Sequence, residues 1–374
     1  MSRFGRLETT GREAAAAVAL AALDRAGIEP GKVELTVVAN AFGIAERQAH
    51  VGPLLNTALG IPQVPSFTVE SACSSSSAAL HEAFVHVAGG FQDVVLVVGF
   101  EKLSHLGTLA ATSYFAMGAD YPFESANGAT FPGLYATIAD AHARKYGTSS
   151  EELGAVAIKN HANGARNPHA HFQKEISLAT YLASPVVASP LRLYDCCPFS
   201  DGAAAVVVAA AEAVPHPSAE PAVIRASARA GDVGDIHDRE SMTSLAATQT
   251  AARAAFRQAH LEPREVQFLE VHDCFTIAEL VALEDLGFFP PGSAGKATRE
   301  GVTARDGTLP VNSSGGLKAK GHPVSATGAA QVVEVFEQMN GLAGSRQVPH
   351  AEVALTHNVG ATGSSCSVHL FSRR

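Results

Sequence analysis

The chain has 374 residues and a formal net charge of −9, and 47% of its residues are hydrophobic. This length is too great for one ordinary core and predicts two domains or one large α/β unit. The acidic balance without a basic block argues against nucleic acid as a main partner, and the lack of a run of about 18 apolar residues argues against a membrane span.

The chain contains five cysteines, which bear on the class of protein. They are Cys73, Cys196, Cys197, Cys274 and Cys366. Their number is odd, they form no CxxC pair, and the chain is large. This pattern is typical of reduced thiols rather than of a disulfide framework. Neither end carries a signal peptide or a Ser-Lys-Leu address, so we expect a cytoplasmic protein.

The first predicted elements recur later in the chain. The segment AALDRAGIEPGKVELTVVANAFG begins at residue 21, and AFRQAHLEPREVQFLEVHDCFT begins at residue 255. Placing Pro30 on Pro263 gives an offset of 263 − 30 = 233, and each segment then predicts a helix, a Glu-Pro turn and an apolar strand. A loop-to-helix element and a buried strand follow in each half: SACSSSSAALHEAFVHVAGG and DVVLVVGF, then KGHPVSATGAAQVVEVFEQMNG and EVALTHNVG. Two copies of one α/β unit are favoured over a coincidental similarity.

Between the two copies, residues 104–195 are polar and rich in His, Asn, Pro and Gly. We expect an irregular insertion that covers a site. His161, His169 and His171 lie in it, but their spacing fits no usual zinc pattern. Substrate contact or plain surface is therefore favoured over metal binding.

Cys73 stands at the start of the first loop-to-helix element. If residues 74–88 form a helix closed by Gly89, the thiol lies at its N-terminus, where free N–H groups and the helix dipole favour an anion. We therefore expect the pKa of Cys73 to be lowered toward the thiolate. Small side chains would let this helix pack closely on all sides, so the thiol is expected at the bottom of a pocket. The alternative is a small buried residue without a chemical role.

The second copy carries a histidine at the equivalent place. His322 precedes Pro323, and proline is favoured in the first turn of a helix. Pseudo-twofold symmetry would bring the two helix starts together, which favours a catalytic role for both His322 and Cys73.

Two more segments fall where α/β folds place chemistry. His272 and Cys274 follow the predicted strand at 266–271, at a position where such folds bind ligands. The glycine-rich turn HNVGATG, residues 357–363, can bring backbone N–H groups close to a ligand.

The set CSS, HDCF, KGHPVSATG and the terminal glycine-rich turn resembles the thiolases, in particular the sterol-carrier-protein type, in which HDCF replaces the NEAF of other thiolases. The segments GATFPGLYA, KNHANGARNPHAHFQKE and DCCPFSDGAAAVVV are similar to the same branch, so the likeness covers nearly the whole chain. The resemblance implies that Cys73 is the nucleophile that takes up the acyl group and that His322 activates it and helps bind the thioester oxygen of the second substrate. It implies that Cys274 is the acid/base and that His272 occupies the position that in other thiolases holds an oxyanion-hole water. It also implies that the N–H of Gly360, with that of Cys73, forms the other oxyanion hole.

The resemblance also implies an architecture. It is an α/β thiolase fold, with two pseudo-symmetric βαβαβαββ halves in a five-layered αβαβα arrangement and an inserted loop domain. We place the N-terminal half at residues 1–215, including the insertion at about 104–195, and the C-terminal half at 216–374. The chain begins where family members have already completed a first strand, so either the start is truncated or the first sheet lacks a strand.

The sequence departs from the family at several cysteine positions. Asn358 stands where many thiolases have a second catalytic cysteine, so the general acid must come from elsewhere. Cys274 is favoured, and Cys366, which we expect within a strand, is the rival. The adjacent Cys196 and Cys197 are interpreted as buried packing.

A Claisen condensation needs a soft nucleophile, a base for a weakly acidic α-proton and an oxyanion hole for the enolate. The resemblance accordingly implies an acetyl-CoA C-acyltransferase that forms or thiolytically cleaves 3-ketoacyl-CoA through an acyl-cysteine, with a coenzyme A thioester as substrate and no further cofactor or metal. The alternatives are a retro-aldolase of a coenzyme A thioester and a non-catalytic subunit of an acyltransferase complex. A homodimer or homotetramer is implied, as is a small partner protein with a zinc ribbon and an OB-fold. No residues for the coenzyme A phosphates stand out.

Overall fold

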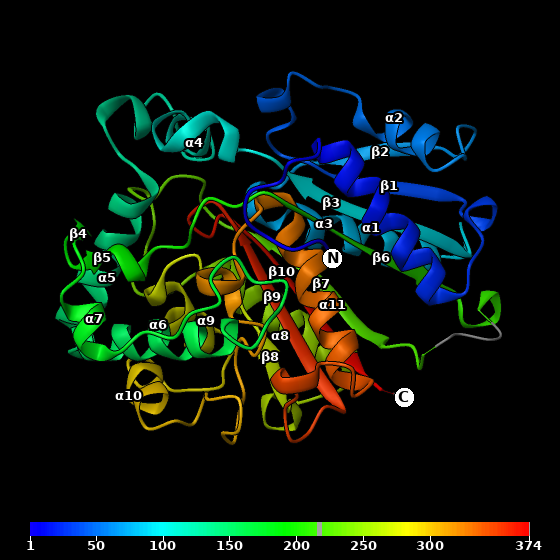
Figure 1. Cartoon of the computed structure of the whole chain (residues 1–374). Coiled ribbons are helices and arrows are strands. Elements are labelled where there is room, and N and C mark those ends of the chain that lie inside the picture. Colours follow the sequence, from blue (N-terminus) through cyan, green and yellow to red (C-terminus); the bar gives the residue numbers. More distant parts are fainter. Residues whose placement is uncertain (215–218, 374) are drawn as a thin grey trace.

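The structure, a computed structural model, describes residues 1–214 and 219–373 (Figure 1). Its strands are β1 (Leu35–Ala39), β2 (Ser66–Val69), β3 (Val94–Glu101), β4 (Val186–Ala188), β5 (Leu191–Arg192), β6 (Gly202–Ala209), β7 (Val223–Gly231), β8 (Phe268–Glu270), β9 (Val353–Gly360) and β10 (Ser365–Ser372). Its α-helices are α1 (Gly11–Ala26), α2 (Val51–Ala58), α3 (Ser75–Ala88), α4 (Gly107–Ala116), α5 (Phe131–Tyr146), α6 (Ser150–Gly164), α7 (Leu178–Leu182), α8 (Ala246–Ala259), α9 (Thr276–Asp285), α10 (Ala294–Arg299) and α11 (Thr327–Met339).

Two four-stranded sheets form the framework. The first has the order β2-β1-β3-β6, in which β1 pairs in parallel with β2 and β3, and β6 runs antiparallel to β3. The second has the order β7-β10-β9-β8, in which β8 and β9 are parallel and β10 runs antiparallel to both of its neighbours. The buried strands are rich in valine, leucine and alanine, as is usual for strands covered on both faces.

The helices and sheets stack in five layers (Figure 1). Helices α3 and α11 lie between the sheets, because α3 contacts β1, β3, β7 and β10, and α11 contacts β3, β6, β8 and β9. Helices α1 and α2 cover the outer face of the first sheet, and α8 covers that of the second. This arrangement confirms the predicted αβαβα fold and puts the starts of α3 and α11 in the centre of the molecule.

The internal repeat is confirmed at the predicted offset. Pro30 and Pro263 each open a 3-10 turn that leads to a strand, β1 in the first copy and β8 in the second. The preceding helices both end in a left-handed residue, Gly27 with φ 69° and His260 with φ 53°. The counterpart of β2 in the second copy is reduced to one parallel bridge, between Leu269 and Val311.

The first sheet also lacks a full strand before α1. Gly5 forms a single antiparallel bridge with Asp201, whereas the equivalent β7 pairs along the length of β10. The backbone N–H of Ser2 donates to the carbonyl of Ala203, 2.8 Å away, so the segment still follows the sheet edge. Among the described residues, those before α1 thus add one β-bridge to the first sheet and no strand.

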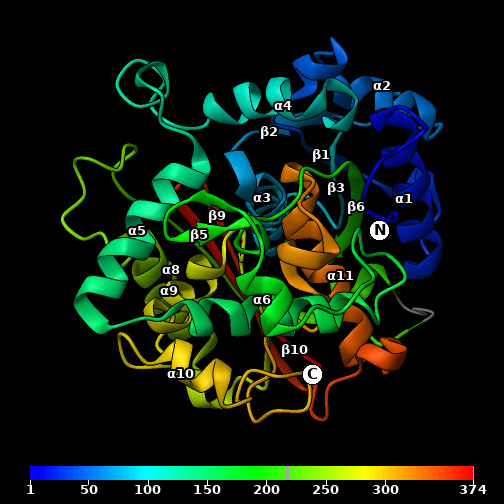
Figure 2. The ribbon, with the colours of Figure 1, turned by 60° about the vertical axis from the view of Figure 1, so that its left-hand side comes forward.

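The insertion at 104–195 is more regular than the sequence indicated. It contains α4, α5, α6, α7 and the β4–β5 hairpin, so the prediction of an irregular segment was wrong. Local signals explain the helices: Ser149 and Glu152 form a capping box at the start of α6, and Thr130 caps α5. Figure 2 brings this side forward and shows the insertion beside α3 and α11. Within residues 1–214 and 219–373, none of the helices has the length and apolarity needed to span a membrane.

Candidate active site

The starts of the two central helices meet, as the sequence predicted. Cys73 lies in a 3-10 turn (Ala72–Ser74) that runs into α3, and His322 precedes a 3-10 turn (Val324–Ala326) that runs into α11. The N–H of Ala329 in α11 donates to Ser76 Oγ in α3, 2.9 Å away. This contact needs small residues, because the serine, glycine and alanine at these helix starts leave the two backbones room to approach.

Three reactive side chains come together at this point. The sulfur of Cys73 and one ring nitrogen each of His272 and His322 lie within 4.8 Å of one another. The two imidazole rings are nearly perpendicular, at 86°, with centroids 5.2 Å apart. All three residues are buried, and His272 has no exposed surface.

The hydrogen bonds of His322 determine which nitrogen carries its proton. Thr327 Oγ1 lies 2.7 Å from His322 Nδ1 and 3.0 Å from the carbonyl oxygen of Pro323. The carbonyl can only accept, so the threonine hydrogen points to it and Nδ1–H of His322 donates to Thr327. Nε2 is then left without a hydrogen and has no partner among the described residues, so it is free to take a proton. Burial lowers the pKa of His322 to about 3 and keeps the ring neutral.

The prediction of a lowered pKa for Cys73 was wrong. Burial raises the pKa of this thiol to about 12, and the neighbouring Cys197 adds to the rise. The backbone N–H groups of Ala361 and of Cys73 itself contact the sulfur and oppose the rise only in part. The start of a helix favours an anion, but removal of water from the thiolate outweighs that effect here.

An apolar cluster is the physical cause of this burial. Cys73 packs with Phe42, Leu103 and Val324, and Phe115 of α4 lies over them. The Phe42 and Phe115 ring centroids are 5.6 Å apart. These contacts exclude water from the sulfur, so Cys73 and His322 rest as a neutral thiol and a neutral imidazole.

The glycine-rich turn after β9 does bring backbone N–H groups to the site. Gly360 packs against the Cys73 turn so closely that a Cβ there would lie 2.6 Å from the carbonyl oxygen of Ser71. The N–H that contacts the sulfur belongs to Ala361, the next residue, which has the left-handed φ of 53°. Ala72, just before Cys73, is also left-handed, with φ 46°. Of these two left-handed residues, Ala361 directs its N–H to the thiol.

Cys274 lies beside the same centre and has a partner that the sequence did not reveal. The hydroxyl of Tyr135, from α5, donates to the carbonyl of Ala361 at 3.1 Å and is hydrogen-bonded to the Cys274 thiol. The Tyr135 ring stacks on Phe275 with centroids 4.5 Å apart. Burial raises the pKa of Cys274 well above its usual value, so this thiol is protonated at rest.

Cys196 and Cys197 pack against the hydrophobic core, as we interpreted them. Both are only half-buried, and the N–H of Cys197 donates to the carbonyl of Cys274, 2.9 Å away. Cys197 also raises the pKa of Cys73, so it lies at the border between the core and the candidate site. By contrast, Cys366 lies within β10, is 1% exposed, and its sulfur accepts from Thr248 Oγ1 at 3.6 Å. That residue is in a packed strand, as predicted.

The histidines of the insertion are spread out. His161 Nδ1 lies 3.2 Å from the carbonyl of Lys174, whereas His171 Nδ1 lies 2.9 Å from Ser200 Oγ. Ser200 Oγ in turn accepts from the N–H of His322 at 3.2 Å. His171 therefore supports the turn that carries His322, and His169 is half-buried nearby in the chain.

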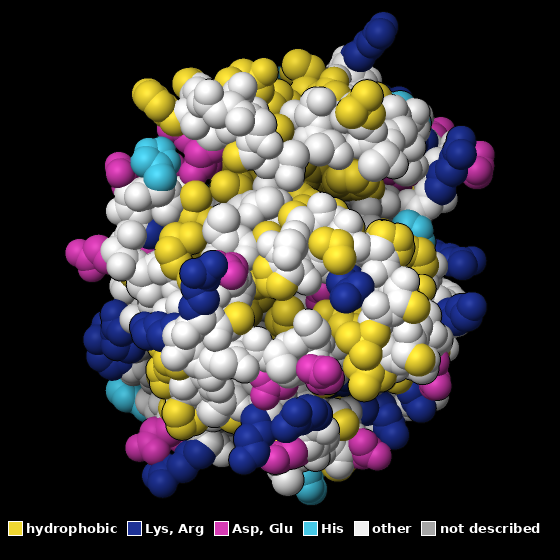
Figure 3. Space-filling model, turned by 90° about the vertical axis from the view of Figure 1, so that its left-hand side faces the viewer, with side chains coloured by type: hydrophobic (Ala, Val, Ile, Leu, Met, Phe, Trp, Pro, Cys, Tyr) yellow, Lys and Arg dark blue, Asp and Glu magenta, His cyan; other side chains and the backbone are white. Residues whose placement is uncertain are grey.

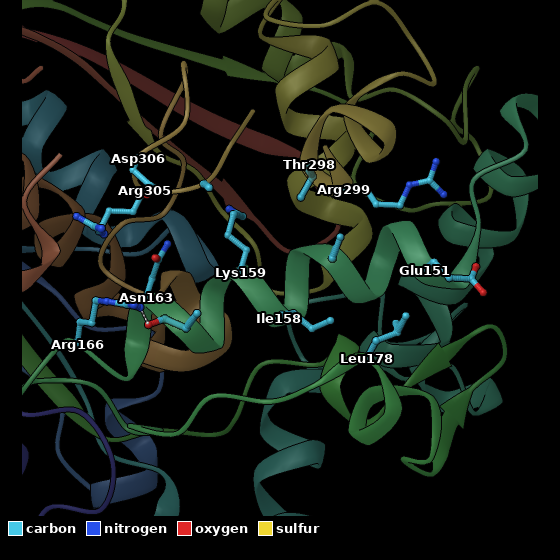
Figure 4. A pocket seen from close by; sticks show the side chains of 13 residues that line it. Glu151, Ile158, Lys159, Asn163, Arg166, Leu178, Thr298, Arg299, Arg305 and Asp306 are labelled. Atoms are coloured by element: carbon cyan, nitrogen blue, oxygen red, sulfur yellow. Dashed lines mark hydrogen bonds between the residues drawn. The ribbon is translucent and has the colours of Figure 1, made fainter. Parts of the chain in front are cut away.

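A cavity of about 450 Å³ lies away from this centre, between α6, α10 and the segment 304–306 (Figure 4). Its charged lining includes Lys159, Arg166 and Arg305. Lys159 is already engaged, because its Nζ lies 2.8 Å from Glu279 Oε1. None of the residues assigned to the chemistry lines it, so it is a separate feature.

Comparison with known proteins agrees with this geometry. The family model for the N-terminal domain of thiolases matches residues 2–212, and the thiolase C-terminal domain-like model matches residues 228–373. An acetyl-CoA acetyltransferase from Methanothermobacter thermautotrophicus is 41% identical over 374 residues, which cover 100% of this chain and 97% of the relative. Sterol carrier protein 2 from Bos taurus is 34% identical over 82% of this chain and 59% of its own.

Among solved structures, the Ltp2-ChsH2(DUF35) aldolase superposes with a TM-score of 0.87, at 23% identity, and covers 100% of this chain and 96% of its own. At that identity the likeness concerns the fold alone. The family models cover nearly the whole chain and agree with the resemblance seen in the motifs. The chain belongs to the thiolase family.

Proposed function

We propose that this protein is a thiolase-type acyltransferase that forms or thiolytically cleaves 3-ketoacyl-CoA through an acyl group on Cys73. The observation that carries the proposal is the Cys73 sulfur within 4.8 Å of a histidine pair in which His322 Nε2 is free to take a proton. The full-length relative from Methanothermobacter, named an acetyl-CoA acetyltransferase, supports the same reaction class.

The first step follows from the neutral pair. In the direction of cleavage, the Cys73 sulfur attacks the 3-keto carbon while its proton moves to His322 Nε2, so charge develops on the keto oxygen and on the imidazole rather than on an isolated thiolate. The N–H groups of Cys73 and Ala361, both beside the sulfur, are placed to stabilise that oxyanion. The acyl transfer is therefore driven by the approach of the substrate.

Cys274 completes the proton balance. The bond between carbons 2 and 3 breaks, carbon 3 remains on the Cys73 sulfur, and carbon 2 of the departing thioester takes the proton of Cys274. The proton held by His322 then passes to the Cys274 thiolate. Incoming coenzyme A gives its thiol proton to His322 Nε2 as it attacks the acyl group, and Cys73 leaves with that proton. Condensation is the reverse sequence. A protonated resting thiol at Cys274 suits the cleavage direction, because it is ready to act as an acid.

The two alternatives are less well supported. A retro-aldolase needs no acyl-cysteine, yet here Cys73 has both a base and two backbone donors at its sulfur. The aldolase among the solved structures shares the fold at 23% identity and says nothing on the reaction. A non-catalytic subunit has no need of a water-excluded thiol with an ordered histidine.

Acylation can be tested directly. Intact-mass spectrometry after exposure to acetyl-CoA should reveal one acetyl adduct, and Cys73→Ala should abolish it. Cys366→Ala is the matched control, because it removes another buried thiol from a packed strand. No adduct on the unaltered protein, or an adduct that persists in Cys73→Ala, would overturn the proposal.

We also propose that the chain forms at least a homodimer in the cytoplasm and works with a small zinc-ribbon and OB-fold partner. The outer strand β2 of the first sheet has Phe67 38% exposed and offers unpaired backbone groups. Around the insertion, Leu109 and Phe123 are 86% and 72% exposed, and Figure 3 shows apolar side chains around a hollow on that side.

All five cysteines are free, which suits a reducing compartment. Light scattering that finds a monomer at micromolar concentration, for the protein alone, would refute the dimer, and Phe67→Lys should weaken it.

A further inference from the structure

A chain of buried hydrogen bonds connects the backbone of β9 to His272. The carbonyl oxygen of His357 accepts from Gln331 Nε2 at 3.2 Å, and Gln331 Oε1 accepts from Asn358 Nδ2 at 3.3 Å. Asn358 Nδ2 lies 2.9 Å from His272 Nδ1. Gln331, Asn358 and His272 have no exposed surface.

The direction of every bond in this chain is fixed by its first member. A carbonyl can only accept, so Gln331 must present its NH₂ group to His357 and its oxygen to Asn358. Asn358 must then present its NH₂ group to both Gln331 and His272. His272 Nδ1 therefore accepts, and the hydrogen of the neutral ring is on Nε2, which has no partner among the described residues. Burial, followed by the neighbouring His322, lowers the pKa of His272 well below its usual value, so the ring stays neutral.

The two histidines at the nucleophile thus hold opposite tautomers. His322 has a bare Nε2 because its Nδ1–H donates to Thr327, whereas His272 has Nε2–H because its Nδ1 accepts from Asn358. One ring is set as a proton acceptor and the other as a hydrogen-bond donor, a few ångströms apart and out of contact with water.

We propose that Gln331 and Asn358 are positioning residues that hold His272 as an Nε2–H donor to the thioester oxygen of the coenzyme A substrate, where negative charge develops in the enolate. This inference rests on the proposed acyltransferase function. It gives Asn358, which occupies the place of a catalytic cysteine in many relatives, a defined task in this chain. His272 then contacts the substrate oxygen directly, which replaces the expectation that this position holds a water.

The proposal predicts that the two half-reactions separate. The enolate exists only in the carbon–carbon step, whereas acylation by acetyl-CoA uses Cys73, His322 and the backbone donors. Asn358→Asp should therefore retain acylation and lose about 10²- to 10³-fold in acetoacetyl-CoA cleavage, the usual effect of one lost oxyanion donor. The introduced carboxylate accepts from Nδ1–H of His272 and leaves Nε2 bare.

The pH dependence of acetoacetyl-CoA cleavage in Asn358→Asp tests which nitrogen of His272 carries the hydrogen. In Asn358→Asp the loss should be larger in alkaline buffer and smaller in mildly acidic buffer, because protonation of the pair formed by the introduced carboxylate and His272 again puts a hydrogen on Nε2. The bare Nε2 of the variant would also join Cys73 and His322 as a third zinc ligand, backed by a carboxylate. Inhibition by added zinc should therefore be stronger for Asn358→Asp than for the unaltered protein.

Gln331→Met provides a second variant without a new charge. It frees the Asn358 amide to rotate, so we expect a smaller loss in cleavage, again with acylation retained. Gln338→Met is the matched control, since Gln338 is also on α11 and 1% exposed but bonds to Ser313, Glu334 and the carbonyl of Arg346. Equal losses in Gln331→Met and Gln338→Met would assign the effect to packing and overturn the proposal.

The tautomer can also be measured without any activity. Selective ¹⁵N labelling of histidine distinguishes the N–H nitrogen of a neutral ring from the bare nitrogen, and His272→Gln identifies the resonance. The proposal predicts Nε2–H for His272 in the unaltered protein, and Nδ1–H refutes it. Failure of acetylation in the unaltered protein refutes the proposed function instead, so the two failures are distinguishable.

Discussion

Cys274→Ala tests the division of labour between the thiols. Cys274 is 5% exposed, is protonated at rest, and has Tyr135 as a hydrogen-bond partner beside the Cys73 centre. Removal of a positioned general acid typically costs about 10²- to 10⁴-fold in rate. Each factor of ten is about 1.36 kcal/mol, so the barrier to carbon–carbon cleavage should rise by about 2.7 to 5.4 kcal/mol.

The assay pairs single-turnover acetylation with steady-state thiolysis of acetoacetyl-CoA. Cys274→Ala should acquire the acetyl group at nearly the normal rate, because His322 handles the proton of that step, and should be slow in thiolysis. Cys366→Ala is the control. Cys366 lies within β10, and its sulfur accepts a hydrogen bond from Thr248 of α8. Its acetylation and its thiolysis should both be close to normal.

Two outcomes would contradict this assignment. If Cys366→Ala loses thiolysis while Cys274→Ala retains it, the proton of the carbon–carbon step is supplied from the terminal hairpin and not from the HDCF segment. A Cys274→Ala variant that fails in acetylation as strongly as in thiolysis would also contradict the assignment, since it would place Cys274 in the first step.

Three further predictions follow from the same geometry. Thr327→Val removes the acceptor of the 2.7 Å hydrogen bond from His322 Nδ1–H. Because an unsatisfied buried donor costs about 1 to 3 kcal/mol, acetylation should slow by about 5- to 150-fold. An unchanged single-turnover rate of acetylation would contradict this. The rate of Cys73 alkylation by iodoacetamide should rise about tenfold for each unit of increase in pH, without a plateau at neutral pH. The reason is that a thiol with a pKa of about 12 has only a small thiolate fraction, which grows with pH. A plateau below about pH 8 would instead indicate a thiolate–imidazolium pair. Ala361→Gly should raise the free energy of unfolding by up to about 1 kcal/mol, because glycine accepts the φ of 53° without strain; a lower denaturation midpoint would contradict this.

Much of the fold was predictable because it follows from short-range patterns. The helix after Cys73 was expected at 74–88 and runs from Ser75 to Ala88, and the repeat offset of 233 recurs in the left-handed ends of α1 and α8. A helix, a Glu-Pro turn and a strand are encoded within about twenty residues. The expected meeting of Cys73 and His322 needed only one further idea, the symmetry of a duplicated unit.

What the sequence could not supply were properties that depend on residues distant in the chain. The pKa of Cys73 was predicted from its helix start alone, but its burial comes from Phe42, Leu103 and Val324, which are separated from it by up to 251 residues (324 − 73). Tyr135 reaches Cys274 from the insertion, and no local pattern singles out that tyrosine. The helices of the insertion, in contrast, had a readable signal in the Ser149 and Glu152 capping box.

The duplicated architecture explains how two neutral groups would suffice for the proposed chemistry. Each copy contributes one helix start, and at each start a tight turn precedes the helix: Cys73 lies in the first turn and His322 lies just before the second. Because both starts are buried between the sheets, an ion pair at rest would lack the water that stabilises it, and the proton stays on sulfur. The thiol is then poorly reactive toward general electrophiles. In the proposed mechanism, the backbone donors stabilise the charge that forms on a bound thioester or 3-keto group, so substrate binding triggers the proton transfer to His322. Selectivity and reactivity thus have one origin, the exclusion of water at the meeting point of α3 and α11.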